Sequence, residues 1–138
     1  MGIEITKEIR STVTDDGSIE LSISRVEKPV PKEGEVLIRV EAAPINPSDL
    51  GLLISFAADL DTLKVSGSGD GTVTSMKIHE QFMRTMTARV GQSMPAGNEG
   101  SGVVEAAGEG ATGLVGKTVG VAGGGMYAGY RCLAANNC

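Results

Sequence analysis

Glycine is the residue that most restricts how this chain can fold. The 138-residue sequence contains 20 glycines, and they are concentrated after position 97. There they separate short aliphatic runs at 103–104, 119–121 and 130–134. Glycine is unfavourable inside helices and is typical of tight turns and close backbone contacts. This region is therefore predicted to form tightly turned strands of a small β barrel.

The first third of the chain also predicts antiparallel strands. Three runs rich in β-branched side chains are separated by turn-forming residues: 3–13, 18–26 and 36–42, with turns at 15–17 and 31–34. In the third run Val36, Ile38 and Val40 alternate with more outward positions that include Leu37. A period of two is typical of a strand with one buried face.

A first, short helix is expected to begin at Asn46. Asparagine is a favourable N-cap residue, and Pro47 suits the first helical position. Asp49 suits the positive end of the helix, which is predicted to run through Leu53.

A second helix is expected over 75–90, after a glycine- and serine-rich loop at 65–71. An apolar stripe recurs there every four residues from Ile78 to Val90. We interpret this stripe as packing surface and not as a ligand site.

Composition excludes several classes of function. Hydrophobic residues make up 41% of the sequence and charged residues 21%, which predicts one folded domain over 1–138. The net charge is -5 and the basic residues are scattered, so nucleic acid and anionic membranes are not expected as partners. No run is long enough to span a membrane, and we expect a cytoplasmic protein.

Two glycine motifs resemble nucleotide loops. Residues 108–113 match G-x-G-x-x-G, and 111–118 come close to a P-loop but carry Ala111 in place of the first glycine. Both motifs work only where a helix begins after the loop and offers its N-terminus to phosphate. Further glycines at 116, 120 and 123–125 predict that no helix follows, so we expect turns here.

Metal and thiol chemistry have little support. The sole histidine, His79, is expected to be a solvated helix residue, because the sequence around it does not complete H-E-x-x-H. Cys132 and Cys138 have no visible activating base, and two cysteines six positions apart build neither a disulfide framework nor a zinc ribbon.

Several segments together resemble the medium-chain dehydrogenases/reductases. They are the third strand at 35–41, the Ile-Asn-Pro-Ser-Asp run at 45–49, the run 97–104 with its later glycines, and 127–132. The resemblance covers most of 30–138 apart from an unusual insertion at about 55–93. Zinc alcohol dehydrogenases of this family carry cysteine and histidine ligands where this chain has Asn46 and Asn98. Amides are poor ligands for zinc, so the pattern is similar to the zinc-free quinone oxidoreductase branch.

The resemblance implies a mainly β fold with short helices, a GroES-like partly open β barrel without the Rossmann domain. It implies the substrate-side domain of an NADPH- or NADH-dependent reductase of quinones or activated alkenes, with the cofactor bound mainly by the missing domain and the isolated chain inactive. Asn46 would be the catalytic group and, with Pro47, a wall of the cofactor cleft. Ser48, Asp49 and Tyr127 would contact substrate. No metal ligand is expected.

Alternatives stay open from the sequence. Asn46 either donates to the acceptor oxygen or only caps its helix. Glu99 is read as a structural acid, and the glycines at 97, 100 and 102 as close-packing residues. The 55–93 insertion is either a lid or a dimer arm. Instead of an enzyme half, the chain could be a stand-alone GroES-like binding or homo-oligomerisation module, or the N-terminal domain of a zinc alcohol dehydrogenase.

Overall fold

The computed structural model describes residues 2–138, which divide into two compact units. Unit 1 comprises residues 2–8, 25–45 and 97–138, and unit 2 comprises residues 9–24 and 46–96. Strands β1 (Ile5–Val13) and β2 (Ser18–Glu27) contribute residues to both units. Whether 1–138 is a single domain stays a prediction.

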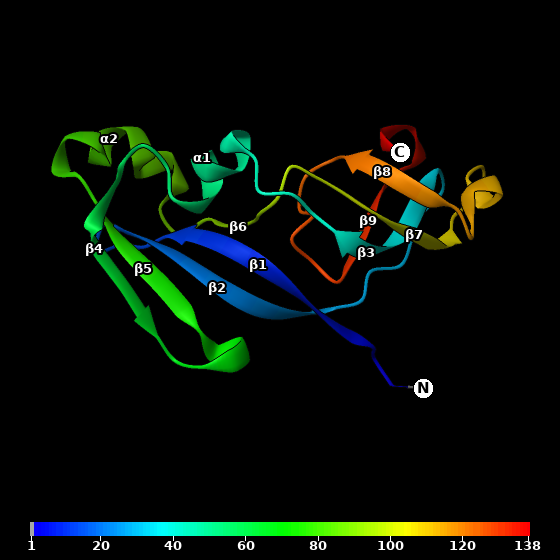
Figure 1. Cartoon of the computed structure of the whole chain (residues 1–138), viewed down its shortest axis with the longest axis horizontal. Helices are drawn as coiled ribbons and strands as arrows, with labels where there is room; N and C mark the ends of the chain where they lie inside the picture. Colours follow the sequence, from blue (N-terminus) through cyan, green and yellow to red (C-terminus); the bar gives the residue numbers. More distant parts are fainter. Residues whose placement is uncertain (1) are drawn as a thin grey trace. The chain divides into compact units, whose positions relative to one another are not determined.

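Unit 1 is built on a four-stranded antiparallel sheet in the order β8-β7-β3-β9 (Figure 1). Its strands are β3 (Glu35–Ala42), β7 (Glu99–Ala107), β8 (Thr118–Ala122) and β9 (Tyr130–Ala134), with short 3-10 turns η5 (Thr112–Leu114) and η6 (Ala135–Asn137). Its core is aliphatic and includes Val36, Ile38 and Val104, all essentially inaccessible to solvent.

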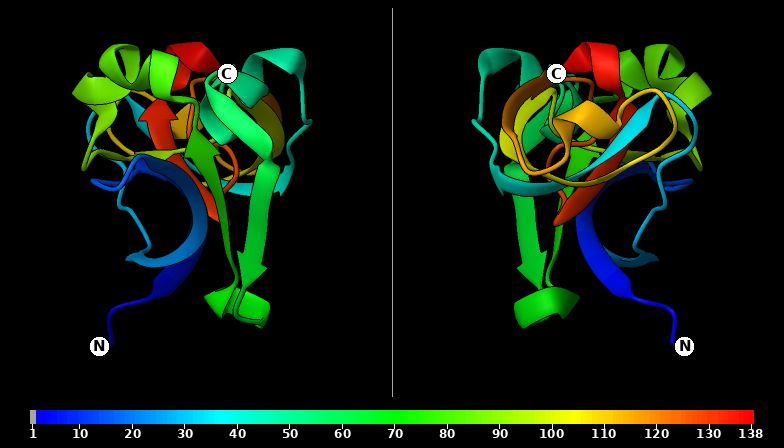
Figure 2. Two further views of the ribbon diagram at one scale, coloured as in Figure 1. Left: turned by 90° about the vertical axis from the view of Figure 1, so that its left-hand side faces the viewer. Right: turned by 90° about the vertical axis from the view of Figure 1, so that its right-hand side faces the viewer.

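Unit 2 contains most of a five-stranded sheet in the order β4-β5-β2-β1-β6, with β4 (Ala58–Ser66), β5 (Val73–Ile78) and β6 (Ser93–Pro95). Its helical segments are short: η1 (Pro47–Asp49), α1 (Leu50–Leu53), η2 (Gly69–Gly71), η3 (Glu80–Phe82), α2 (Met83–Met86) and η4 (Thr87–Arg89). The η2 turn closes the β4–β5 hairpin, and the helices adjoin its other end (Figure 2). The core includes Val13, Ile19 and Met76.

The predicted fold class is confirmed. The described chain is mainly β with short helices, and within residues 2–138 neither sheet closes into a barrel, because β8, β9, β4 and β6 each pair on one side only. This is consistent with a partial GroES-like domain. The expected strands at 3–13, 18–26 and 36–42 and the glycine-separated strands after 97 are all present. The first helical segment ends at Leu53, as predicted.

The second predicted helix is wrong over 75–79, whereas short helical segments do follow over 80–89. Residues 73–78 form strand β5, and helical structure begins only at Glu80. The predicted loop at 65–71 is instead the end of β4 and the hairpin turn, with Gly67 and Gly69 at positive φ. The four-residue stripe nevertheless marks core residues, because Ile78 ends the strand and packs with Met86 from the helix. Ile78 ends a strand, while Phe82 and Met86 lie in the helical segments that follow. Their four-residue spacing therefore resembled that of one continuous helix.

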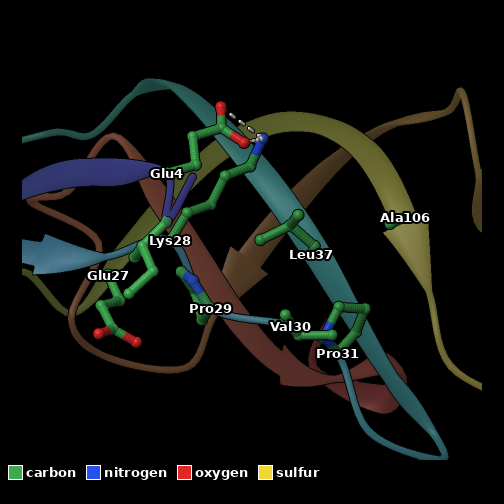
Figure 3. A pocket seen from close by; sticks show the side chains of 9 residues that line it. Glu4, Glu27, Lys28, Pro29, Val30, Pro31, Leu37 and Ala106 are labelled. Atoms are coloured by element: carbon green, nitrogen blue, oxygen red, sulfur yellow. Dashed lines mark hydrogen bonds and ion pairs between the residues drawn. The ribbon is translucent and has the colours of Figure 1, made fainter. Parts of the chain in front are cut away.

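One outward position of β3 is also buried. Leu37 has a relative exposure of 5%, although its neighbours in the strand face the unit 1 core. Leu37 lies in a hollow with Pro29, Val30 and Pro31, which precede β3 and line this face (Figure 3). The alternation of the strand is therefore correct, but its second face is covered by a segment whose path the pattern did not reveal.

Two glycines of unit 1 are required by close backbone packing. A Cβ atom at Gly108 would lie 1.8 Å from the carbonyl oxygen of Lys32, and one at Gly102 would lie 2.1 Å from that of Arg39. Gly100 similarly approaches the carbonyl of Ala42. These contacts support the expectation that the glycines of this region serve packing.

We expect Gly108→Ala to destabilise the protein. The added methyl group would force the backbone carbonyl of Lys32 to move, and overpacking of this kind costs about 1–3 kcal/mol. Gly113→Ala is the matched control, because a Cβ there meets nothing within 4 Å. Urea unfolding measures the free energy of unfolding of both variants. Equal stability of the two would show that the predicted clash is absent.

Candidate functional site

The residues expected to carry the chemistry begin unit 2's first helical segment. Asn46 is the N-cap of η1, with extended backbone angles (φ -97, ψ 160), and Pro47 follows at the first helical position. The backbone N–H of Asn46 donates to Oδ2 of Asp49 at 2.7 Å. The backbone N–H of Asp49 donates in turn to the carbonyl oxygen of Asn46 at 2.9 Å. The turn therefore holds Asn46 from both sides.

Asp49 differs from the other residues of this segment in how deeply it is buried. Asp49 is 2% exposed, and its carboxylate accepts a hydrogen bond from the backbone. Asn46 is half-buried, while Pro47 and Ser48 are exposed. A buried, bonded carboxylate is suited to orienting its neighbours. Asp49 therefore acts on the position of Asn46, and the side chains of Asn46 and Ser48 have the access to solvent that a ligand contact needs.

Tyr127 lies in unit 1 and is anchored to backbone. Its hydroxyl donates to the carbonyl oxygen of Pro44 at 2.8 Å. Its ring lies against Gly97, where a Cβ atom would come within 2.7 Å of the Tyr127 ring and backbone nitrogen. This contact explains why position 97 is glycine. The hydroxyl is thus engaged in holding the 44 and 97 segments near each other.

The motif segment at 97–98 is paired with the glycine-rich loop at 123–126. The N–H of Met126 donates to the carbonyl of Gly97 at 3.0 Å, and the N–H of Gly124 donates to that of Asn98 at 3.1 Å. Asn98 and Glu99 are exposed. The structure therefore gathers Asn98 and Tyr127 in unit 1, and Asn46 to Asp49 in unit 2.

The glycine motif at 108–113 has no helix after it. The three residues of η5 follow, and strand β8 begins at Thr118. The predicted absence of a phosphate-binding helix is confirmed for this motif, and Gly108 is explained by its contact with Lys32. Residues 108–118 therefore do not form the turn and helix that bind a dinucleotide pyrophosphate.

Two further candidate sites are a metal cluster and the hollow over Leu37. Among residues 2–138 no three His, Cys, Asp or Glu side chains gather as a metal site would require. His79 is exposed, at the N-cap of η3. The hollow over Leu37 has a volume of about 430 Å³, but its ammonium group, on Lys28, is already paired with Glu4 at 3.2 Å (Figure 3). The same ammonium group is also paired with Glu105 at 3.4 Å.

Sequence reasoning missed an aromatic group in unit 2. Phe56 and Phe82 pack edge to face with ring centroids 5.2 Å apart, and the ring of His79 lies 6.4 Å from that of Phe82. The sequence contained one usable signal: the chain has only two phenylalanines and one histidine, and all three fall between 55 and 93.

No helix within residues 2–138 is long and apolar enough to cross a membrane.

Comparison with known proteins gives matches among solved structures alone. No protein-family model and no curated protein matches the sequence. A protein of Mesorhizobium loti assigned as an NADPH:quinone reductase is 26% identical, with a TM-score of 0.57, and the match covers 100% of this chain and 37% of that one. A mycobacterial protein solved in complex with NADPH is 24% identical, with a TM-score of 0.53 and coverage of 96% and 31%.

An alcohol dehydrogenase shares the same fold. The thermostable alcohol dehydrogenase of Pyrobaculum aerophilum is 23% identical, with a TM-score of 0.56, and the match covers 97% of this chain and 40% of that one. The chain thus spans about a third of the length of the first two structures. It shares its fold with oxidoreductases of the medium-chain dehydrogenase/reductase kind, and this likeness supports a relationship with that superfamily.

Proposed function

We propose that this chain is the substrate-side part of an NAD(P)H-dependent reductase of quinones or activated alkenes, and that it is inactive alone. We assign the nucleotide to a separate domain, because no helix follows the dinucleotide-like motif at 108–113. When bound there, the reduced nicotinamide supplies the hydride. The residues of this chain would bind and orient the acceptor. The Mesorhizobium loti and mycobacterial structures support the reaction class.

The observation that carries the proposal is the held position of Asn46. Hydride addition to a quinone or enone carbon leaves negative charge on the conjugated oxygen, and preorganised donors stabilise such charge. Asn46 has two amide hydrogens to donate, a half-buried side chain, and a backbone fixed by Asp49. A donor already in place does not have to reorganise when charge develops on the oxygen.

The proposed reaction is independent of zinc. Asn46 and Asn98 stand where the resemblance places metal ligands, and neutral amides bind zinc poorly. The same amide groups suit hydrogen bonding to an acceptor oxygen. We therefore assign Asn46 to substrate and not to metal.

Asn46→Asp separates a donor role from a capping role. Aspartate retains the N-cap acceptor but has no amide hydrogen. We expect the variant to keep its free energy of unfolding and to bind tetramethyl-1,4-benzoquinone about 2- to 10-fold more weakly, the effect of one lost hydrogen bond. Binding is followed by the shift of the backbone amide signal of residue 46 in ¹⁵N NMR, which the wild type and the variant share.

Asn136→Asp is the matched control, because Asn136 is exposed and lies in the C-terminal turn η6. It adds the same charge and should leave quinone affinity unchanged. Unaltered affinity in Asn46→Asp would leave Asn46 as a helix cap only and would remove the proposed catalytic role. Quinone-dependent oxidation of NADPH by the wild-type chain alone would overturn the proposed inactivity.

The thiols are not expected to take part. Burial, with a further contribution from the Glu35 carboxylate, raises the pKa of Cys132 to about 11. Burial also raises the pKa of the Cys138 thiol. A thiol is nucleophilic only as the thiolate, so both remain largely protonated at neutral pH. This disfavours covalent catalysis by either cysteine.

Alkylation tests this assignment. In a Cys138→Ser variant, the rate at which iodoacetamide modifies Cys132 should be low at pH 8 and should rise as the pH approaches about 11, because the thiolate forms only near the raised pKa. Mass spectrometry of timed samples gives the rate. A rate that already levels off at pH 8 to 9 would contradict the raised pKa.

A further inference from the structure

Unit 2 brings together three of the chain's few aromatic side chains, counting histidine. The sequence has two phenylalanines, two tyrosines, one histidine and no tryptophan. Both phenylalanines and the histidine form one group, with 5.2 Å between the Phe56 and Phe82 centroids and 6.4 Å between His79 and Phe82. The Phe56–Phe82 pair is edge to face, at 87°. Such a pair occupies a face of only one of its two rings.

The backbone around Phe56 holds its ring in solvent. Phe56 is 70% exposed, whereas Ala57 beside it is fully buried and Ser55 is also buried. Small side chains thus enter the core on both sides while the large one points outward. Burying a phenylalanine would stabilise the fold by about 1.5–3 kcal/mol, and the chain forgoes that gain at this position.

The backbone conformation of Ser55 holds the Phe56 ring in this outward position. Ser55 has a φ of +59, the single positive value among the non-glycine residues that the structure describes. Its N–H donates to the carbonyl of Leu50 and thereby ends α1, and its Oγ accepts the N–H of Ala57 at 3.2 Å. A left-handed conformation at serine costs roughly 1–2 kcal/mol. Strained residues of this kind cluster at ligand sites.

Polar groups adjoin the aromatic rings. His79, Glu80 and Gln81, which directly precede Phe82, line an open hollow on the surface. Imidazole and the glutamine amide both carry N–H groups that can donate to a carbonyl oxygen. The residues before Phe82 therefore add donors beside one ring of the aromatic group.

We propose that Phe56, Phe82 and His79 form a binding platform for a planar conjugated ring of the quinone class, which stacks on one ring face because the rings are inclined to one another by 87° and 67°. This inference rests on the proposed function, since that function supplies the ligand class. The platform is separate from Asn46: η1 and α1, three and four residues long, lie between them, a rise of roughly 10 Å at about 1.5 Å per residue. It would be a second contact point for the same kind of ligand.

The test uses the intact chain labelled with ¹³C in its phenylalanine rings and ¹⁵N in its asparagines. Tetramethyl-1,4-benzoquinone is titrated against cyclohexane-1,4-dione, which has two carbonyls but no planar ring. We expect the Phe56 and Phe82 ring signals to shift with the quinone and not with the dione. Phe56→Leu should weaken quinone binding at this site about 2- to 10-fold, and Phe56→Tyr, which keeps the ring, should retain it.

Leu60→Ala is the matched control, since Leu60 is an exposed apolar residue of β4 outside the aromatic group. It should bind quinone as the wild type does. Wild-type affinity in Phe56→Leu, or equal ring shifts with the dione, would overturn the platform. Shifts at Asn46 without shifts at Phe56 would overturn the platform and leave the proposed function standing. Ring shifts that disappear in Phe56→Leu, without any shift at Asn46, would support the platform and contradict the role of Asn46.

Discussion

The hydrogen bond between the Asp49 carboxyl group and the Asn46 backbone fixes the start of η1, the segment that carries the proposed donor. Asp49 is almost wholly buried and accepts the Asn46 N–H at 2.7 Å, so the N-cap is held by an acceptor shielded from water. This bond sets the backbone position from which the Asn46 side chain extends. The short helical segment that starts there ends at Leu53, and the left-handed backbone of Ser55 beyond it turns Phe56 outward. Two candidate contacts for an acceptor thus lie before and after one short helical segment.

Unit 1 depends on a different constraint, the absence of side chains at its glycines. Gly102 and Gly108 allow carbonyl groups to approach at distances that a Cβ atom would forbid, and Gly97 gives room to the Tyr127 ring. All three contacts lie within motifs that resemble a nucleotide-binding signature or a family signature. In the motif at 108–113, Gly108 is required by its contact with Lys32. The helix that would bind phosphate is replaced there by three residues of 3-10 turn.

The sequence predicted the strands and the first helical segment, whose formation depends on residues that are neighbours in the chain. The strands followed from β-branched runs between turn residues, and the η1–α1 segment followed from asparagine, proline and aspartate at cap positions. The helix over 75–90 was mispredicted because Ile78 and Phe82 have helical spacing although one ends a strand. The burial of Leu37 depends on how the segment at 29–31 packs against β3. The outward position of Phe56 depends on the strained backbone of a single residue, Ser55. Asp49 was predicted at the positive end of the first helix, but its near-complete burial was not predicted.

A double-mutant cycle on quinone affinity tests this account most directly. Tetramethyl-1,4-benzoquinone binding is measured for the wild type, Asn46→Ala, Asp49→Asn and the double variant. If Asp49 acts by holding Asn46, Asp49→Asn will weaken binding in the wild-type background and have no further effect when Asn46 is already alanine. Equal losses in both backgrounds, or no loss in either, would contradict the claim that the Asp49–Asn46 pair positions the acceptor.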